Sequence, residues 1–189
     1  KMFCNVINDE VTRLARFIDD LLHLSRMEVG ATTLNLQVTN MRRLLEEATK
    51  KIQPLIEQKN QTFKADLPGK LPELIVDKDK FAVAVINLLG NATKYTPEGG
   101  SVRLHVVLLD KAIQIDVEDS GIGIAEEELP KVLDKFYRSS DPRVHGEIGS
   151  GLGLSIAHEI VRLHGGKLSV SSEVNKGSKF TILLPTTAE

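Results

Sequence analysis

Apolar side chains recur at alternating steps of four and three residues along the first part of the chain. The residues at these steps are Ile7, Val11, Leu14, Ile18 and Leu21. This spacing is typical of a helix that packs in a bundle, and it predicts one long helix over residues 3–28 that ends near Gly30. Further apolar positions widen the stripe, namely Phe3, Phe17, Leu22 and Leu24. Because so broad an apolar face is unfavourable in water, we expect partner helices to cover it.

After Gly30 the pattern changes to short alternating segments that are interspersed with helical ones. The predicted strands are residues 34–38, 62–67, 73–76, 102–109, 112–118, 167–172 and 179–184. The predicted helices are residues 40–58, with Asn40 as the cap, and residues 79–95, 126–135 and 152–164. Residues 136–150 follow neither period, and they predict a long loop of the kind that often covers a functional site.

The composition narrows the class of protein. Of the 189 residues, 41% are hydrophobic and 26% are charged, as in a soluble globular protein with one domain and an appendage. The formal net charge of −2 gives no reason to expect nucleic-acid binding. The single cysteine, Cys4, excludes an internal disulfide and fits a reducing compartment. No apolar run approaches the roughly 20 residues that cross a bilayer. Because the chain begins inside a helical pattern without Met, we expect it to be part of a longer protein.

The predicted helix 79–95 carries the first candidate for chemistry. Asn87 and Asn91 lie four residues apart and therefore on one helix face, with Lys94 one turn further on. An Mg²⁺ ion that is held by substrate phosphates needs only one or two protein oxygens, and an ammonium group can meet the same phosphates. The alternative is an ordinary solvated helix surface, but asparagine is a poor helix former and two of them in an apolar stretch need a reason.

Two glycine-containing segments follow in the chain. In the first, Asp119 ends a predicted strand and precedes Ser120-Gly121-Ile122-Gly123. A carboxylate accepts hydrogen bonds, so it suits the exocyclic amino group of adenine, and glycine lets the backbone approach a flat base. In the second, Gly149-Ser150-Gly151-Leu152-Gly153-Leu154 runs into a helix, where free amides bind phosphate. The alternatives are a strand-end turn and a flexible hinge.

Other side chains carry less information. Lys135 and Arg138 precede the predicted loop and place positive charge near it, although a solvated basic pair would look the same. His158-Glu159 could mimic a phosphoacceptor, but we interpret this pair as a solvated helix face. The sequence contains no His/Asp/Glu cluster typical of a transition metal and no Ser/His/Asp set typical of acyl transfer.

In this order the motifs resemble those of the catalytic, ATP-binding domain of sensor histidine kinases, a branch of the GHKL ATPase and kinase superfamily. Residues 87–97 resemble the N box, 119–123 the G1 box, 136–138 the F box and 149–154 the G2 box. Residues 176–180 are similar to the last glycine-containing strand motif, and residues 13–26 to the second helix of the dimerisation hairpin.

The resemblance implies an α/β fold, a two-layer α/β sandwich of the Bergerat type, with a mixed sheet covered by helices and preceded by one long N-terminal helix. It implies residues 1–30 as the partial hairpin and 31–189 as the catalytic domain. ATP and Mg²⁺ are the implied cofactors, with Asn91 as the metal ligand and with Asn87, Lys94 and Arg138 as catalytic groups. The implied nucleotide-binding residues are Asn87, Asn91, Lys94, Tyr95, Asp119, Gly121, Gly123, Gly149, Ser150, Gly151, Leu152 and Gly153.

The implied partners are the phosphoacceptor helix of the same or a partner subunit, a response regulator receiver domain and a second copy that dimerises through the N-terminal helix. The implied location is cytoplasmic, with a possible membrane anchor elsewhere in the whole protein. The chain departs from the family in two places. It lacks the segment with the acceptor histidine, and Asn175 stands where glycine is common before Gly177.

Two other functions stay open. Related ATPases place a glutamate four residues before the metal asparagine to activate water, and here that position is Asn87, an amide that accepts no proton at neutral pH. We therefore expect slow ATP hydrolysis, and we favour phosphoryl transfer over hydrolysis as the reaction. The second alternative is a nucleotide-dependent interaction module without transfer activity, in which ATP orders residues 136–150 for partner binding.

Overall fold

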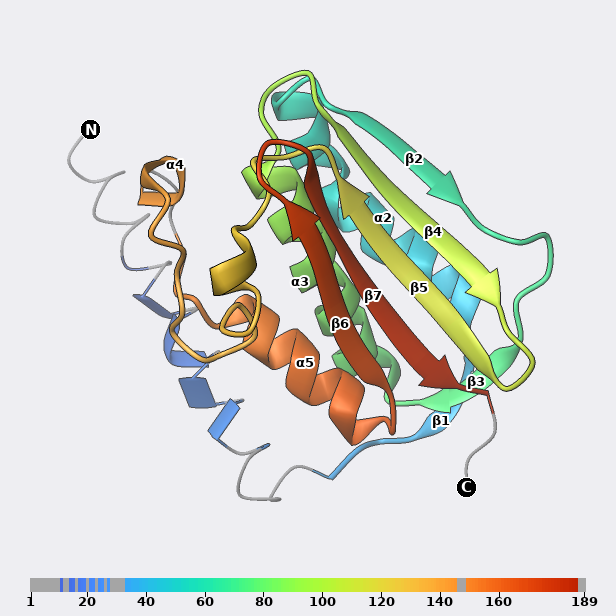
Figure 1. The fold of residues 1–189 in the computed structure, drawn as a ribbon. Coiled ribbons are helices and arrows are strands. Elements are labelled where there is room, and N and C mark those ends of the chain that lie inside the picture. Colours follow the sequence, from blue (N-terminus) through green and yellow to red (C-terminus); the bar gives the residue numbers. More distant parts are fainter. Residues whose placement is uncertain are drawn as a thin grey trace. The chain divides into compact units, whose positions relative to one another are not determined.

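A computed structural model gives the fold (Figure 1). The described residues are 33–145 and 149–186, together with Val11, Leu14, Ala15, Phe17, Ile18, Asp19, Leu21, Leu22, Leu24, Ser25 and Met27. The chain divides into two compact units, Lys1–Thr33 and Leu34–Glu189. This boundary lies close to the one expected at residue 30.

The described residues of the first unit between positions 11 and 27 are helical, as the heptad-like spacing predicts. Four residues of the predicted stripe are exposed by 40–60% of their surface: Val11, Leu14, Ile18 and Leu21. Ile7, the predicted helix start at residue 3 and the predicted stop at Gly30 lie outside the described residues. The exposed stripe is a surface that needs a partner in water.

The second unit is built on a five-stranded sheet in the order β2-β4-β5-β7-β6 (Figure 1). The strands are β2 (Thr62–Asp66), β4 (Ser101–Leu108), β5 (Ala112–Asp119), β6 (Lys167–Glu173) and β7 (Gly177–Pro185). β2 runs parallel to β4, whereas the other neighbours are antiparallel. The sheet is therefore mixed, as expected.

Three helices cover one face of this sheet: α2 (Met41–Gln58), α3 (Lys78–Tyr95) and α5 (Gly153–Leu163) (Figure 1). Their apolar sides meet the inward-facing residues of the strands, and fully buried examples are Leu45, Phe81, Leu88, Leu104, Ile115 and Ile160. A small antiparallel sheet of β1 (Gln37–Asn40) and β3 (Glu73–Val76) completes the unit. The two-layer α/β sandwich is confirmed.

Polar caps fix where the helices begin. The Asn40 side chain accepts the Arg43 amide at 2.9 Å, so the predicted cap of α2 is confirmed. α3 begins one residue before the predicted start because Asp77 caps it and accepts the Lys80 amide at 3.0 Å. His164 ties α5 to this cap, since its Nε2 accepts the Asp77 amide at 2.9 Å. Burial lowers the pKa of His164, and the imidazole acts here as a neutral acceptor.

Three predicted elements differ from the structure. The first strand begins at Gln37 rather than residue 34. The predicted helix over 126–135 is wrong, because only a 3₁₀ turn, η1 (Glu126–Glu128), forms there and turns follow it. Pro130 has no amide hydrogen, which prevents continuous helical bonding, and the backbone bonds here join residues three apart. The loop 136–150 contains one helical turn, α4 (Pro142–His145).

Candidate functional site

The end of α3 meets the bend that follows β5. The Tyr95 carbonyl accepts the Ile122 amide at 3.2 Å, which joins the asparagine-bearing helix to the Asp119 segment. A Cβ atom at Gly121 would lie 2.5 Å from the same carbonyl oxygen. Glycine is therefore required at position 121 for the close approach of two backbones.

Asp119 lies at the last position of β5, where its Oδ1 accepts the Gly121 amide at 2.8 Å and the Ser178 amide at 3.3 Å. Gly177 makes this arrangement possible, because a Cβ atom there would lie 1.8 Å from the Asp119 carbonyl oxygen. Burial raises the pKa of Asp119 to about 6, although the two amides favour the charged form. The side chain is therefore mostly ionised at pH 7 and half ionised near pH 6.

The glycine-rich segment 149–154 also lies against α3, next to Asn87 and Lys94. A Cβ atom at Gly153 would lie 3.3 Å from Asn87 Oδ1, and one at Gly149 would lie 2.7 Å from Lys94 Nζ. The start of α5 has no side-chain cap, so its first amides remain available for an anion. The lysine Nζ also lies 3.1 Å from the Tyr95 hydroxyl. The absence of side chains at both glycines leaves a cradle beside an amide oxygen and an ammonium.

These segments border a pocket that encloses about 620 Å³ of space, part of it open to solvent. The predicted residues that line it are Asn91, Tyr95, Asp119, Gly123 and Arg138, together with apolar side chains such as Ile122, Ile124, Leu154 and Phe180. The predicted site therefore forms one connected region rather than separate surfaces.

The other predicted residues lie around this pocket rather than in its lining. Asn87, Lys94, Gly149 and Gly153 form the cradle described above, and Gly121 lies behind the bend. Ser150 Oγ accepts the Leu152 amide at 3.3 Å. Leu152 is fully buried, so its side chain belongs to the core and only its backbone remains for binding. Gly151 lies against the backbone of Phe136 and Tyr137 and has a φ of +72°.

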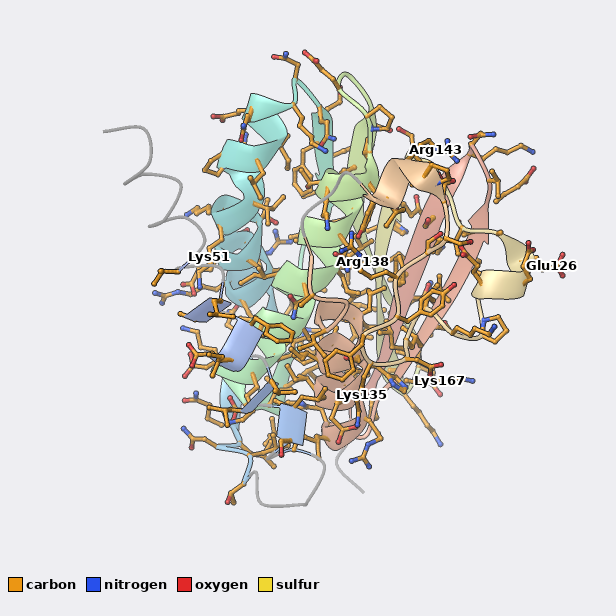
Figure 2. The ribbon with its side chains drawn as sticks, turned by 90° about the vertical axis from the view of Figure 1, so that its left-hand side faces the viewer. Lys51, Glu126, Lys135, Arg138, Arg143 and Lys167 are labelled. Atoms are coloured by element: carbon orange, nitrogen blue, oxygen red, sulfur yellow. The ribbon has the colours of Figure 1, made fainter. Side chains whose placement is uncertain are left out.

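Arg138 connects the backbone at Val144 with the backbone at Gly149. Its guanidinium donates to the Val144 carbonyl at 3.1 Å and to the Gly149 carbonyl at 3.2 Å. Figure 2 labels Arg138 on the segment that leads to α4 and Arg143 on α4 itself. A catalytic role for Arg138 stays a prediction, and its contacts show a residue that shapes the loop.

Sequence reasoning missed two polar contacts beside the pocket. Glu128 is buried and accepts hydrogen bonds from Ser139 and Ser140. Arg143 donates to Asn175 Oδ1 at 2.7 Å, and Asn175 has a φ of +62°. The departure from glycine at position 175 was visible in the sequence, and asparagine tolerates this conformation better than most residues. In the sequence, nothing distinguishes the buried Glu128 from its neighbours Glu126 and Glu127.

Comparison with known proteins identifies the family. A profile of the histidine kinase-, DNA gyrase B- and HSP90-like ATPases matches residues 76–188, which is more than half of the chain and includes all three motifs. The chain belongs to this ATPase family. In the part of the chain that the structure describes, no group of three or more His, Cys, Asp or Glu side chains could hold a metal ion.

The relatives of this ATPase-family chain include sensor kinases. It is 35% identical over 177 residues to the adaptive-response sensory kinase SasA of Synechococcus sp. (strain JA-3-3Ab), covering 93% of this chain and 46% of that protein. It is 34% identical over 185 residues to the sensor histidine kinase WalK of Bacillus subtilis (strain 168), covering 97% of this chain and 30% of that one. The chain thus spans less than half the length of either relative.

A solved structure shares the fold. The nucleotide-free catalytic domain of the histidine kinase ThkA superposes with a TM-score of 0.72 at 26% identity, and the match covers 82% of this chain and all of that domain. In the part of the chain that the structure describes, no helix is long and apolar enough to span a membrane.

Proposed function

We propose that residues 31–189 form the Mg-ATP-binding catalytic domain of a sensor histidine kinase, and that residues 1–30 are the second helix of its dimerisation hairpin. The observation that carries the proposal is the convergence of three distant segments on one pocket, joined by the contact between the Tyr95 carbonyl and the Ile122 amide. A cytoplasmic location, where Mg-ATP is available, is part of the proposal.

Asp119 would select the base. Its Oδ1 is already occupied by two backbone amides, which fixes the orientation of the carboxylate. The second oxygen then accepts the exocyclic amino group of adenine, a donor that guanine lacks at that place. The apolar side chains of Ile122, Ile124 and Phe180 in the pocket lining offer a surface for the flat faces of the ring.

The cradle at the start of α5 would hold the phosphates. Asn91 would supply an amide oxygen to Mg²⁺, which prefers oxygen ligands and is otherwise held by phosphates and water. When bound, the ion neutralises negative charge on the phosphates. Lys94 and the uncapped amides of α5 add positive potential from two sides, and Asn87 lies beside the same glycines.

The proposed reaction transfers the γ-phosphoryl group to a histidine imidazole on the dimerisation hairpin. The bond between the γ-phosphorus and the bridging oxygen of ADP breaks, a bond between phosphorus and an imidazole nitrogen forms, and ADP leaves. Because phosphoryl transfer depends on positioning and charge neutralisation, this domain needs no nucleophile of its own. The phosphoryl group would then pass to an aspartate of a response regulator.

The lack of a suitable base in the pocket disfavours ATP hydrolysis. Among the described residues that line the pocket, Asp119 has the only carboxylate, and it is assigned to the base. Asn87 offers an amide where hydrolases of this family need a proton acceptor. Without a base to activate water, bound ATP is hydrolysed slowly and survives until an acceptor histidine is presented.

The test begins with calorimetric titration of Mg-ATP into the parent protein and into Asn91→Ala. We expect the variant to lose at least tenfold in affinity and to lose the dependence on Mg²⁺, because one metal oxygen is removed. Val83→Ala is the matched control, since Val83 lies on the same helix but is 45% exposed. Equal affinities of Asn91→Ala and the parent would refute the assignment.

A transfer assay then separates kinase from interaction module. The chain is mixed with a separate dimerisation hairpin that carries an acceptor histidine, and γ-labelled ATP is added. Label on that histidine supports the kinase. Intact ATP binding with an unlabelled hairpin supports the module, and steady release of inorganic phosphate supports a hydrolase.

A further inference from the structure

Three consecutive glutamates follow the Asp119 bend, and they differ in exposure. Glu126 and Glu127 are exposed, whereas Glu128 is 9% exposed. Figure 2 shows Glu126 pointing outward from η1. A glutamate is rarely buried unless its carboxylate is hydrogen-bonded or paired, so the contacts of Glu128 indicate its role.

The hydrogen-bond partners of Glu128 come from residues 137–140. Its Oε2 accepts the Ser139 hydroxyl at 2.6 Å, and its Oε1 accepts the Ser140 amide at 2.9 Å and the Ser140 hydroxyl at 3.0 Å. Burial and the neighbouring Glu128 carboxylate raise the pKa of Tyr137. The hydrogen bonds that Glu128 accepts, chiefly that from Ser139, hold the pKa of Glu128 below its ordinary value. The acceptor is therefore charged at neutral pH, which strengthens each bond.

The same segment forms one wall of the pocket. Tyr137, Arg138 and Ser139 all line it, so the carboxylate of Glu128 lies directly behind that wall. Arg138 extends the connection, because it holds the carbonyls of Val144 and Gly149. A shift of residues 137–140 would therefore move the wall and, through Arg138, the backbone at Val144 and at Gly149 beside the phosphate cradle.

We propose that Glu128 is a positioning residue for the nucleotide, which fixes the 137–140 wall and, through Arg138, the backbone at Val144 and Gly149. The inference rests on the proposed Mg-ATP site and adds a residue that touches neither the nucleotide nor the metal. Without this acceptor, the wall samples several conformations and must be ordered when the nucleotide binds. That ordering cost raises the dissociation constant and shortens the lifetime of the complex.

The main comparison is between Glu128→Ala and Glu127→Ala, two neighbouring variants that remove the same charge. Calorimetric titration with Mg-ATP is expected to give about a tenfold to hundredfold weaker affinity for Glu128→Ala, as for the loss of one or two hydrogen bonds to a charged group. Glu127→Ala is expected to stay within about twofold of the parent. Thermal unfolding without nucleotide identifies any loss of the fold.

A second measurement reports on the wall itself. Hydrogen exchange of the Ser140 amide without nucleotide is expected to be at least about tenfold faster in Glu128→Ala than in Glu127→Ala, because this amide loses its acceptor. Glu128→Gln keeps an oxygen for that amide, and we expect it to recover most of the affinity. The double variant Ser139→Ala/Ser140→Ala removes the two hydroxyl donors and keeps the Ser140 amide, and it tests the proposal should Glu128→Ala fail to fold.

The outcomes separate this inference from the proposed function. A parent protein that binds no Mg-ATP refutes both. Parent binding with equal affinities for Glu128→Ala and Glu127→Ala refutes the role of Glu128 alone, as does unchanged exchange at the Ser140 amide. A purely structural role is indicated by a lower unfolding temperature of Glu128→Ala without any change in the affinity of the folded protein.

Discussion

We expect Asp119→Asn to stabilise the nucleotide-free protein and to destroy base recognition, because the half-buried carboxylate of Asp119 loses part of its hydration in the folded state. Asparagine keeps the Oδ1 acceptor for the Gly121 and Ser178 amides, so the bend is preserved. Its second group is an NH₂ donor in place of an oxygen, which cannot ionise and cannot accept the amino group of adenine. Stability and affinity are therefore expected to change in opposite directions.

The magnitude follows from the pKa. Burial raises the pKa of Asp119 from 3.8 to about 6, a difference of about two units or about 3 kcal/mol. Because the folded-state pKa is the higher one, the stabilising contribution of this group is complete below pH 4 and is lost as the pH rises through 6. At pH 7.5 the parent is thus penalised by up to about 3 kcal/mol relative to Asp119→Asn, and the two proteins differ little at pH 4.

The assay is chemical or thermal unfolding of both proteins without nucleotide between pH 4 and 8. For a unit of this size, about 3 kcal/mol corresponds to a rise of about 6–12 °C in the unfolding temperature of the variant at pH 7.5. Titration with Mg-ATP at pH 7.5 then measures the affinity. We expect it to fall by at least about tenfold, because the NH₂ group of the asparagine would face the amino group of adenine and both groups are donors.

A matched control lies in the same strand. Asp116 is buried on β5, but hydrogen bonds from Thr181, Gln114 and Lys179 overcome the opposing effect of burial and lower its pKa. Asp116→Asn is therefore expected to reduce stability at pH 7.5, the opposite of Asp119→Asn. The reasoning is refuted if Asp119→Asn is no more stable than the parent at pH 7.5, or if it binds Mg-ATP as tightly as the parent.

Further substitutions test the contacts around the pocket. Gly121→Ala is expected to lower both the unfolding temperature and the affinity for Mg-ATP, because its Cβ would lie 2.5 Å from the Tyr95 carbonyl oxygen; unchanged values in both assays would contradict that contact. Asn175→Gly removes one of the acceptors of Arg143, which keeps its bonds to Asp141, and is expected to speed nucleotide dissociation by about two- to tenfold in stopped-flow displacement, as for the loss of one hydrogen bond. Identical dissociation rates would show that this contact does not restrain the loop.

Much of the fold follows from local sequence patterns. The cap at Asn40 and the alternation in β4 and β5 act over a few residues, so the elements were predicted to within a few positions. The helix predicted over residues 126–135 does not form, because Pro130 lacks an amide hydrogen and this outweighs the otherwise helical composition of the segment. The shift of the first strand to Gln37 reflects its pairing with β3, where Gln37 lies opposite Val76, and pairing between distant segments leaves little trace in the local sequence.

The candidate site divides in the same way. The roles proposed for Asp119, Asn91 and the glycines follow from their residue types and order in the sequence, and the structure brings these residues together. Glu128 acts through partners 11 and 12 residues away in the chain, and Arg143 contacts Asn175 32 residues away. Acidic or basic residues in a polar segment otherwise resemble solvated surface. Leu152 belongs to the glycine-rich segment 149–154 that is implied to bind nucleotide, yet it is fully buried. The apolar residue type, rather than membership of the motif, decides which way this side chain faces.

One Mg-adenine nucleotide is proposed to contact all three segments at once. Titration of Mg-ATP into the isotope-labelled protein tests this through the backbone amide chemical shifts. We expect residues 87–95, 119–123 and 149–154 to shift together with one saturation curve, and we expect Mg-GTP not to reproduce the changes at 119–123. Shifts confined to one segment, or separate saturation curves for the three, would contradict it.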